Sequence, residues 1–343
     1  MPPVRPFRAL RYDPEVAGPL ENLVAPPYDV ISPEARLAYL ARSPYNVVHL
    51  TLPDSPEDAA TTLSSWRAQG VLRDEPPAFW WVAQDYVGPD GIGRTREGFA
   101  ASVEASPYGA GRVLPHERTH EGPKQGRLAL LRATSVELEP IFLLYEGEPP
   151  FGAPSGPPAA DVEEGGVRTR LWRVEADGEI ELPTSLLIAD GHHRYETAVA
   201  FREERPEATH LLAVFVSAAA PGLEIFPTHR VVRHVGEVPG VEVDGPGEGV
   251  TLYRDGRYLR VEADDDFGPR VVESFAPEGV TYTPDAGEAV AAVDRGEAEA
   301  AFLLQPVTVE QVASFARAGE TMPQKSTFFY PKLTSGLLFH PVG

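Results

Sequence analysis

Short runs of apolar residues recur along the chain and predict β-strands rather than long buried helices. Strands are expected at 47–52, 79–83, 98–103, 140–145, 167–175, 185–189 and 211–216. The polar stretch GPDGIG at 88–93 separates two of these runs and predicts a hairpin.

Residue pairs that typically begin helices occur between the predicted strands. Ser32 precedes Pro33, and Ser55 precedes Pro56, so each serine is expected to cap a helix that begins at the proline. Further helices are expected at 192–204, 286–298 and 309–317. Because strands and helices alternate without a strict βαβ rhythm, the pattern predicts a mixed α/β (α+β) fold.

A Pro/Gly-rich stretch, 147–166, predicts a linker or an insertion. It separates an N-terminal α/β region, 1–146, from a C-terminal α/β region, 167–343. A single site shared by the two regions is compatible with this division.

Composition narrows the functional classes. The 343 residues include no cysteine, which excludes disulfides, thiolate metal sites and a cysteine nucleophile. The net charge of −21 argues against binding to nucleic acid or anionic membranes. No apolar run has the length of a membrane span or a signal peptide, which predicts a cytoplasmic protein. The sequence does not indicate an oligomeric state.

The segment 186–198 carries the clearest chemistry. An apolar strand ends in Asp190 and Gly191, and a helix then starts with His192, His193 and Arg194. Cationic side chains at a helix N-terminus cost a few tenths to about 1 kcal/mol, and a bound anion reverses the sign. A strand, a glycine turn and a helix N-terminus commonly hold phosphate.

Two other interpretations of this segment stay open. The histidines and Arg194 can be solvated surface residues. Alternatively, Asp190, His192 and His193 can bind a metal, although adjacent helical histidines point about 100° apart.

The string His116-Glu117-Arg118-Thr119-His120 matches the H-E-x-x-H zinc-protease signature. Neighbouring proline and glycine residues and the lack of an apolar stripe favour a polar loop instead. In that loop Glu117 is a candidate base, and Lys124 and Arg127 are candidate phosphate contacts.

Two further segments offer polar groups. Lys325, Ser326 and Thr327 resemble part of a P-loop, but Gln324 stands where that motif requires glycine, so a Walker A site is excluded. These three residues can close over a ligand or belong to a packed C-terminal strand. Asp29 is a candidate base or magnesium ligand, although capping its turn is the commoner role.

Several motifs together resemble the DUF1015 family of bacterial and archaeal proteins without an assigned function. They are PPYDVIS (26–32), HERT (116–119), LWRV (171–174), ADGHHRYETA (189–198), PTHRVV (227–232) and MPQKSTFFYPKLTSGLL (322–338).

The DGHHR element is also similar to the phosphate-binding motif of the ParB/sulfiredoxin-like fold. Members of that fold include a free-serine kinase that uses ADP, sulfiredoxin and the CTP-binding ParB proteins. The similarity implies a ParB/sulfiredoxin-like core with additional mixed-sheet regions. It also implies that Asp190, Gly191, His192, His193 and Arg194 form a nucleotide phosphate site. No counterpart of the kinase's catalytic glutamate can be placed.

The leading hypothesis is a nucleotide-dependent phosphotransferase acting on a small hydroxylated metabolite, with free serine first. ATP or ADP with Mg²⁺ would be bound by the DGHHR residues, with Asp190 as the magnesium ligand. Asp29, Glu117 or Asp190 would accept the hydroxyl proton. The transferring group would be held by the remaining polar candidates: Lys124, Arg127, Lys325, Ser326 and Thr327.

Two alternatives belong to other classes. One is a non-catalytic sensor of a nucleotide or phosphometabolite. The other is a metal-dependent hydrolase built on His116, Glu117 and His120.

Overall fold

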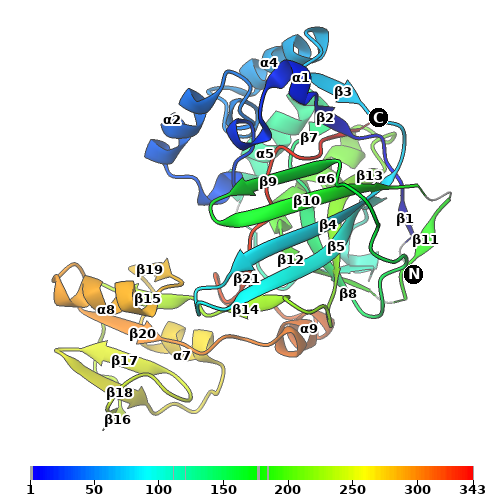
Figure 1. Ribbon diagram of the computed structural model, residues 1–343. Helices are drawn as coiled ribbons and strands as arrows, with labels where there is room; N and C mark the ends of the chain where they lie inside the picture. The colour runs from blue at the N-terminus through cyan, green and yellow to red at the C-terminus, as the bar shows by residue number, and fades with distance from the viewer. Residues whose placement is uncertain (1–2, 111, 120, 176–177, 184, 343) are drawn as a thin grey trace. The chain divides into compact units, whose positions relative to one another are not determined.

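The computed structural model describes residues 3–110, 112–119, 121–175, 178–183 and 185–342. The fold is mixed α/β, as predicted (Figure 1). The chain forms two compact units. Unit 1 comprises Met1–Pro115, Thr119–Leu223 and Pro331–Gly343, and unit 2 comprises His116–Arg118 and Glu224–Tyr330.

This division differs from the one expected at 147–166. Residues on both sides of that stretch belong to unit 1, and the stretch itself contains a strand at Ala160–Glu164. That strand pairs antiparallel with Val167–Val174 and buries alternate side chains. The surrounding prolines and glycines hid this alternation from the sequence pattern.

The strands of unit 1 are β1 (Pro3–Arg5), β2 (Leu10–Tyr12), β3 (Leu72–Asp74), β4 (Phe79–Val87), β5 (Gly93–Glu104), β6 (Val113–Leu114), β7 (Val136–Glu137), β8 (Ile141–Tyr145), β9 (Ala160–Glu164), β10 (Val167–Val174), β11 (Ile180–Glu181), β12 (Leu186–Asp190), β13 (His210–Ser217) and β22 (His340–Pro341). Its helices are α1 (Pro14–Ala17), α2 (Pro33–Arg42), α3 (Val48–Thr51), α4 (Pro56–Ala68), α5 (Glu121–Thr134) and α6 (His192–Glu204), with 3-10 turns η1 (Leu20–Asn22), η2 (Tyr28–Val30) and η3 (Tyr108–Ala110).

One large sheet organises unit 1, in the strand order β6-β12-β8-β13-β5-β4-β10-β9. Strands β4 and β5 form the predicted hairpin, which Figure 1 shows as two long neighbouring arrows. Most pairs are antiparallel, but β8 runs parallel to β13, and β12 runs parallel to β6. Helix α6 packs against β8 and β13 and lies beside α5. The sheet thereby fixes where α6 begins.

The predicted helix caps are present. Ser32 Oγ accepts from the N–H of Ala35, and Ser55 Oγ accepts from the N–H of Asp58. Both serines hold their helices at the positions that the sequence pattern gave. Helix α6 also spans the predicted residues.

The strand predicted at 47–52 is wrong, because this segment forms α3. Asn46 lies two residues before the first helical residue, Val48, and its side-chain oxygen accepts from the N–H of Val48. Val47, Val48 and Leu50 are fully buried in a core formed with α4. A short apolar run does not distinguish a buried strand from a buried helical turn.

Unit 2 contains strands β14 (Glu224–Phe226), β15 (His229–Val232), β16 (Gly240–Val243), β17 (Thr251–Arg254), β18 (Arg257–Val261), β19 (Val280–Thr283), β20 (Ala300–Leu303) and β21 (Phe328–Tyr330), and helices α7 (Gly268–Phe275), α8 (Ala286–Asp294) and α9 (Val309–Arg317). Its main sheet has the order β16-β18-β17-β20-β15-β19, and β14 pairs with β21. Helix α9 is the predicted one, whereas α8 ends before the expected 298. Separate apolar clusters lie in this unit, one containing Phe302 and one containing Ala289.

None of the helices that the structure describes is long and apolar enough to cross a membrane.

Candidate functional site

The DGHHR segment forms a sharp junction between β12 and α6 in unit 1. Gly191 has φ +96, in the left-handed region, which glycine adopts without steric cost. A Cβ at this position would lie 2.9 Å from Cγ2 of Ile141. The first intrahelical hydrogen bond is donated by Tyr195 to Gly191 O, so the preceding amides point along the helix axis toward Asp190. This is the strand–glycine–helix geometry that the sequence predicted.

Asp190 lies between two cations. Its Oδ2 accepts from Arg194 Nη2 at 2.6 Å, and its Oδ1 is paired with Lys332 Nζ. Burial alone raises the pKa of Asp190, but Lys332 and Arg194 outweigh burial and hold this pKa far below its usual value. Asp190 is therefore a carboxylate throughout the neutral pH range, and its position fixes both cations.

Arg194 is also held by the sheet. Its Nη1 donates to the carbonyl of Pro140. Burial lowers the pKa of Arg194, but the charges of Asp190 and Glu139 reverse the direction and raise it. The guanidinium therefore stays charged at the start of α6.

The PPYD segment reaches the same cluster through Glu139, a buried residue that sequence reasoning did not single out. Glu139 Oε1 accepts from the N–H of Tyr28 at 3.1 Å and from Ser335 Oγ at 2.7 Å. The guanidinium of Arg127 lies over the Tyr28 ring, 4.0 Å from its centroid. Asp29 is exposed in η2, and its charge contributes to the raised pKa of Arg194. Asp29, Arg127, Asp190 and Arg194 thus gather in one region of unit 1.

A small cavity lies beside this cluster. It has a volume of about 50 Å³, enough for a few water molecules. Its polar lining comes from Arg127, Glu137, Glu139, Arg194 and Thr197, and leucines supply most of the rest. The cavity therefore offers both charge signs beside Arg194.

Thr119, just before α5, and Lys124, in the first turn of α5, are both linked to α6 through Glu196, a second residue that sequence reasoning did not single out. Thr119 Oγ1 donates to Glu196 Oε2 at 2.8 Å, and Lys124 Nζ lies 3.6 Å from the same oxygen. His192 is buried and His193 is half-buried in the first turn of α6. Lys124 is thereby tied to α6.

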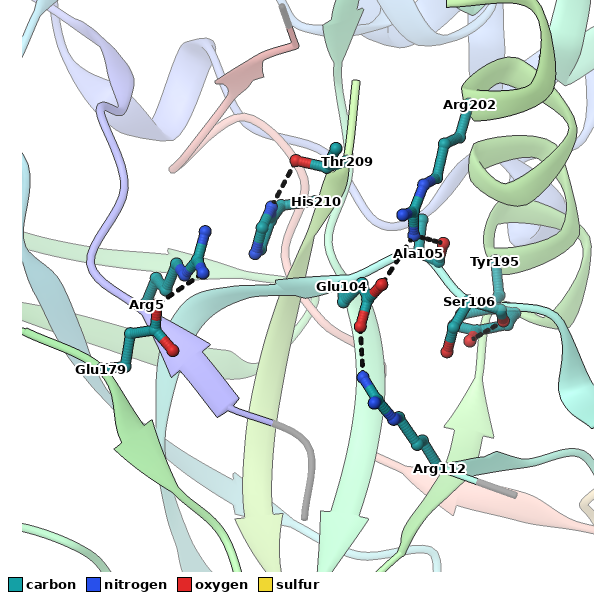
Figure 2. Close-up of polar contacts among 10 residues, drawn as sticks. All are labelled: Arg5, Glu104, Ala105, Ser106, Arg112, Glu179, Tyr195, Arg202, Thr209 and His210. Atoms are coloured by element: carbon teal, nitrogen blue, oxygen red, sulfur yellow. Dashed lines mark hydrogen bonds and ion pairs between the residues drawn. The ribbon is translucent and has the colours of Figure 1, made fainter. Parts of the chain in front are cut away.

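Tyr195 and Arg202 of α6 bind the end of β5 and the two residues that follow it, as Figure 2 shows. Tyr195 donates to the carbonyl of Ser106 at 2.5 Å, and Arg202 donates to the carbonyl of Ala105 at 2.6 Å. Arg202 also pairs with Glu104 at 2.9 Å. These contacts fix the axis of α6 and hence the direction of its N-terminus.

The C-terminal segment 331–338 completes the site. Besides Lys332, it supplies Ser335 to Glu139, and Ser335 exchanges backbone hydrogen bonds with Ala25. The PKLTSG part of the family motif therefore connects PPYD to DGHHR within unit 1.

The remaining predicted residues, Glu117, Lys325, Ser326 and Thr327, lie in unit 2. Thr327 Oγ1 contacts His116 Nε2 at 3.0 Å, and Ser326 Oγ donates to Pro323 O at 2.5 Å. Lys325 is exposed with φ +55. These four residues therefore belong to a different unit from Asp190, which lies in unit 1.

Arg230, from the PTHR motif, holds this unit 2 loop. Its Nη2 donates to the carbonyls of Gln324 and Lys325 at 3.4 and 3.2 Å. Burial lowers the pKa of Arg230 to about 10, so it stays protonated at neutral pH. The PTHR and QKST motifs and the His116–Arg118 part of HERT thus form one structural cluster in unit 2.

The H-E-x-x-H string does not form a zinc-protease helix. Residues 116–119 are non-helical, Glu117 bridges to Met322, and α5 begins only at Glu121. His120 lies outside the described residues. Among the residues that the structure describes, no group of three His, Cys, Asp or Glu side chains could hold a metal ion.

The fold and the junction at Asp190 define a mixed α/β protein with a candidate anion site at a helix N-terminus. The family model described as "Protein of unknown function (DUF1015)" matches residues 4–243, which is more than half of the chain. The chain belongs to this family, as its motifs predicted. The motif at 322–338 lies beyond the matched residues. No curated protein matches the sequence.

Solved structures show distant likenesses. A conserved hypothetical protein from Pyrococcus furiosus is 14% identical, with 68% of this chain and 93% of that chain covered and a TM-score of 0.39. A free serine kinase in complex with AMP is 13% identical, with 70% and 91% covered and a TM-score of 0.43. SbnI with a C-terminal truncation, from Staphylococcus aureus, is 10% identical, with 70% and 86% covered and a TM-score of 0.44. Likeness at this level assigns no function.

Proposed function

We propose that the protein is a nucleotide-dependent phosphotransferase that transfers a phosphoryl group from ATP or ADP to a small hydroxylated metabolite. The observation that carries the proposal is the junction at Gly191, where the N-terminus of α6 meets Arg194 and Lys332, both fixed by Asp190. Helix N-termini and fixed cations are the groups that stabilise phosphates and their transfer.

In this proposal the phosphate-binding roles are given to residues of unit 1. Arg194 and Lys332 neutralise phosphate charge, and His192 and His193 lie in the helical turn that receives it. Lys124 and Arg127 supply further positive charge from α5. Free serine is the first substrate to test, because the DGHHR element is similar to the motif of a fold that includes a free-serine kinase.

Asp190 is unsuited to proton transfer. A general base works best when its pKa is near the working pH, and the pKa of Asp190 is held far below that. In this proposal Asp29 accepts the hydroxyl proton, because it is an exposed carboxylate beside Arg194. Glu117, the other carboxylate predicted as a base, lies in unit 2 and takes no part in this proposal for unit 1.

Asp190 also does not fit the predicted role of direct magnesium ligand. One of its oxygens contacts Lys332 and the other contacts Arg194. Two cations already occupy the carboxylate and repel a divalent ion. No step of the proposal is therefore routed through a metal at Asp190.

The test is phosphoryl transfer by the purified full chain from ATP or ADP to serine and a panel of hydroxylated metabolites, followed by ³¹P NMR. Wild type should form a phosphomonoester, and Arg194→Gln and Lys332→Met should lose at least tenfold in kcat/KM. Arg132→Gln removes an exposed α5 arginine paired with Glu204 and should match wild type. Absence of binding to either nucleotide by calorimetry would refute the proposal.

A non-catalytic sensor of a nucleotide or phosphometabolite is the second candidate. It is favoured by the strong ion pairing of Asp190, which makes the most central carboxylate a poor base. It predicts nucleotide binding that Arg194→Gln weakens, without turnover of any compound in the panel.

A further inference from the structure

Arg96 is a buried cation that the proposed function does not use. It lies on β5 and exposes only 2% of its surface. Its Nη2 donates to the carbonyl of Pro331 at 2.7 Å and to Oε1 of Gln84. Its Nη1 is buried and has no hydrogen-bond partner among the described residues.

The charge of Arg96 lacks an acidic partner. No described carboxylate lies within ion-pair distance of it, whereas the other strongly buried arginine of unit 1, Arg11, pairs with Glu75 at 3.2 Å. Burial lowers the pKa of Arg96 to about 10, against smaller opposite effects of Tyr86 and Asp190, so it is protonated at neutral pH. Burying a guanidinium costs free energy when one of its N–H donors makes no hydrogen bond, and an acceptor that binds this donor reduces the cost.

Arg230 in unit 2 shows what a purely structural arginine looks like in this protein. It is also buried without an ion pair among the described residues, but both of its terminal nitrogens donate to backbone carbonyls. Arg96 differs because one terminal nitrogen is unused. Nη1 of Arg96 can therefore donate to one further acceptor, which the described residues do not supply.

The position of Arg96 connects it to the junction at Asp190. Its guanidinium lies over the ring of Phe142, 4.5 Å from the centroid, and Phe142 is the register partner of Asp190. Register partners project from the same face of a sheet. The carbonyl that Arg96 binds belongs to Pro331, next to Lys332, which is paired with Asp190. Arg96 is therefore connected to the Asp190 carboxylate in two ways. One is through the ring of Phe142, and the other is through Pro331 and the neighbouring Lys332.

The local charge balance favours an anion. Four cations, Arg96, Arg127, Arg194 and Lys332, gather here with three carboxylates, Asp29, Glu139 and Asp190, which leaves one net positive charge. This positive excess stands in a chain of net charge −21. Oxyanions with several acceptor oxygens satisfy such clusters by accepting from more than one guanidinium or ammonium.

We propose that Arg96 is an anion-binding residue of this site and that its Nη1 donates to an oxygen of a phosphate group held by Arg194 and Lys332. The inference deepens the proposed function, on which it rests for the nature of the anion. The segment 331–338 covers Arg96, because the carbonyls of Pro331 and Lys332 accept from Arg96 and Gln84. Anion entry therefore requires this segment to shift, and its return encloses the phosphate.

The test measures binding of inorganic phosphate, pyrophosphate, ADP and adenosine to the full chain by calorimetry. Wild type should bind the three phosphate compounds, and Arg96→Met should weaken each roughly tenfold or more, the usual effect of losing a charge-assisted hydrogen bond. Adenosine binding should not change. Arg11→Met removes a buried arginine from the same unit and should keep the wild-type phosphate affinity.

Two outcomes overturn the inference: wild type that binds no phosphate compound, or a folded Arg96→Met variant with wild-type affinity. If Arg96→Met does not fold, Arg96→Gln replaces it with a neutral polar side chain and is judged by the same criterion. Phosphate binding through Arg96 without phosphoryl transfer refutes only the proposed function. Turnover that Arg96→Met leaves unchanged in KM and kcat refutes only this inference.

Discussion

Asp190 illustrates how a side chain's partners decide its chemistry. The sequence offered it as a base, a magnesium ligand or a phosphate-site residue. In the structure its two oxygens contact Lys332 and Arg194, so it acts as the fixed centre that orients two cations.

Asp190→Asn should destabilise unit 1 by about 3–5 kcal/mol at pH 7, because it leaves two cations, of which only 12% and 21% of the side-chain surface is exposed, without their carboxylate. A depressed pKa contributes stability that is present above the unfolded pKa of about 4 and is lost as pH falls through the folded value. Urea unfolding should therefore show a constant gap between wild type and variant from pH 8 to 5, which narrows below about pH 4.

The control for this prediction is Asp161→Asn, which breaks the exposed pair with Arg168. It should cost about 0–1 kcal/mol. A gap for Asp190→Asn as small as that of the control would contradict the central role of Asp190.

Gly191→Ala should destabilise the protein by at least about 1–2 kcal/mol, the usual cost of a left-handed backbone for an L-residue. The added Cβ would also lie 2.9 Å from Ile141 Cγ2 and force the start of α6 to move. Urea unfolding measures the loss. Gly109→Ala, with open space around its Cβ and no left-handed φ, should change stability by less than about 0.5 kcal/mol.

At the scale of elements, the sequence predicted helices and hairpins correctly where a capping residue or a turn marks them. Ser32, Ser55 and the turn 88–93 placed two helices and a hairpin correctly. Helix α5 was missed because Gly122, Pro123 and Gly126 argue locally against a helix. Leu128 and Leu131 stabilise it by packing against Phe201 of α6, a contact that no local pattern reveals.

Gly126→Ala should stabilise the protein by about 0.5–1 kcal/mol, because glycine inside a helix costs this much relative to alanine. Gly126 is exposed in the middle of α5, and nothing lies within 4 Å of an added Cβ. Thermal and urea unfolding should both show the gain. A loss of stability would mean that α5 is not helical at Gly126.

At the scale of the whole molecule, the functional motifs divide between two units. PPYD, DGHHR and the PKLTSG segment meet in unit 1, whereas PTHR, QKST and the His116–Arg118 part of HERT meet in unit 2. Among the described residues, one apolar cluster that contains Phe99 and Phe215 lies in unit 1 and another that contains Phe302 lies in unit 2, so each unit has a core of its own.

This division predicts that unfolding is not a single transition. The four tryptophans, Trp66, Trp80, Trp81 and Trp172, all belong to unit 1. Tryptophan fluorescence therefore reports unit 1, whereas far-ultraviolet circular dichroism reports both units. Their urea midpoints should differ, since multidomain chains commonly depart from two-state behaviour. Superimposable curves would show that the units unfold together.

The sequence by itself determined the mixed α/β class, the family, the capped helices and the junction at Gly191, because these depend on local residue patterns. Tertiary structure alone decided which distant groups meet there. Glu139, Lys332 and Arg96 come from separate segments, and only the strand order and the path of 331–338 bring them near Asp190. Their charges become chemically meaningful through burial and mutual contact, and neither is encoded in their spacing along the chain.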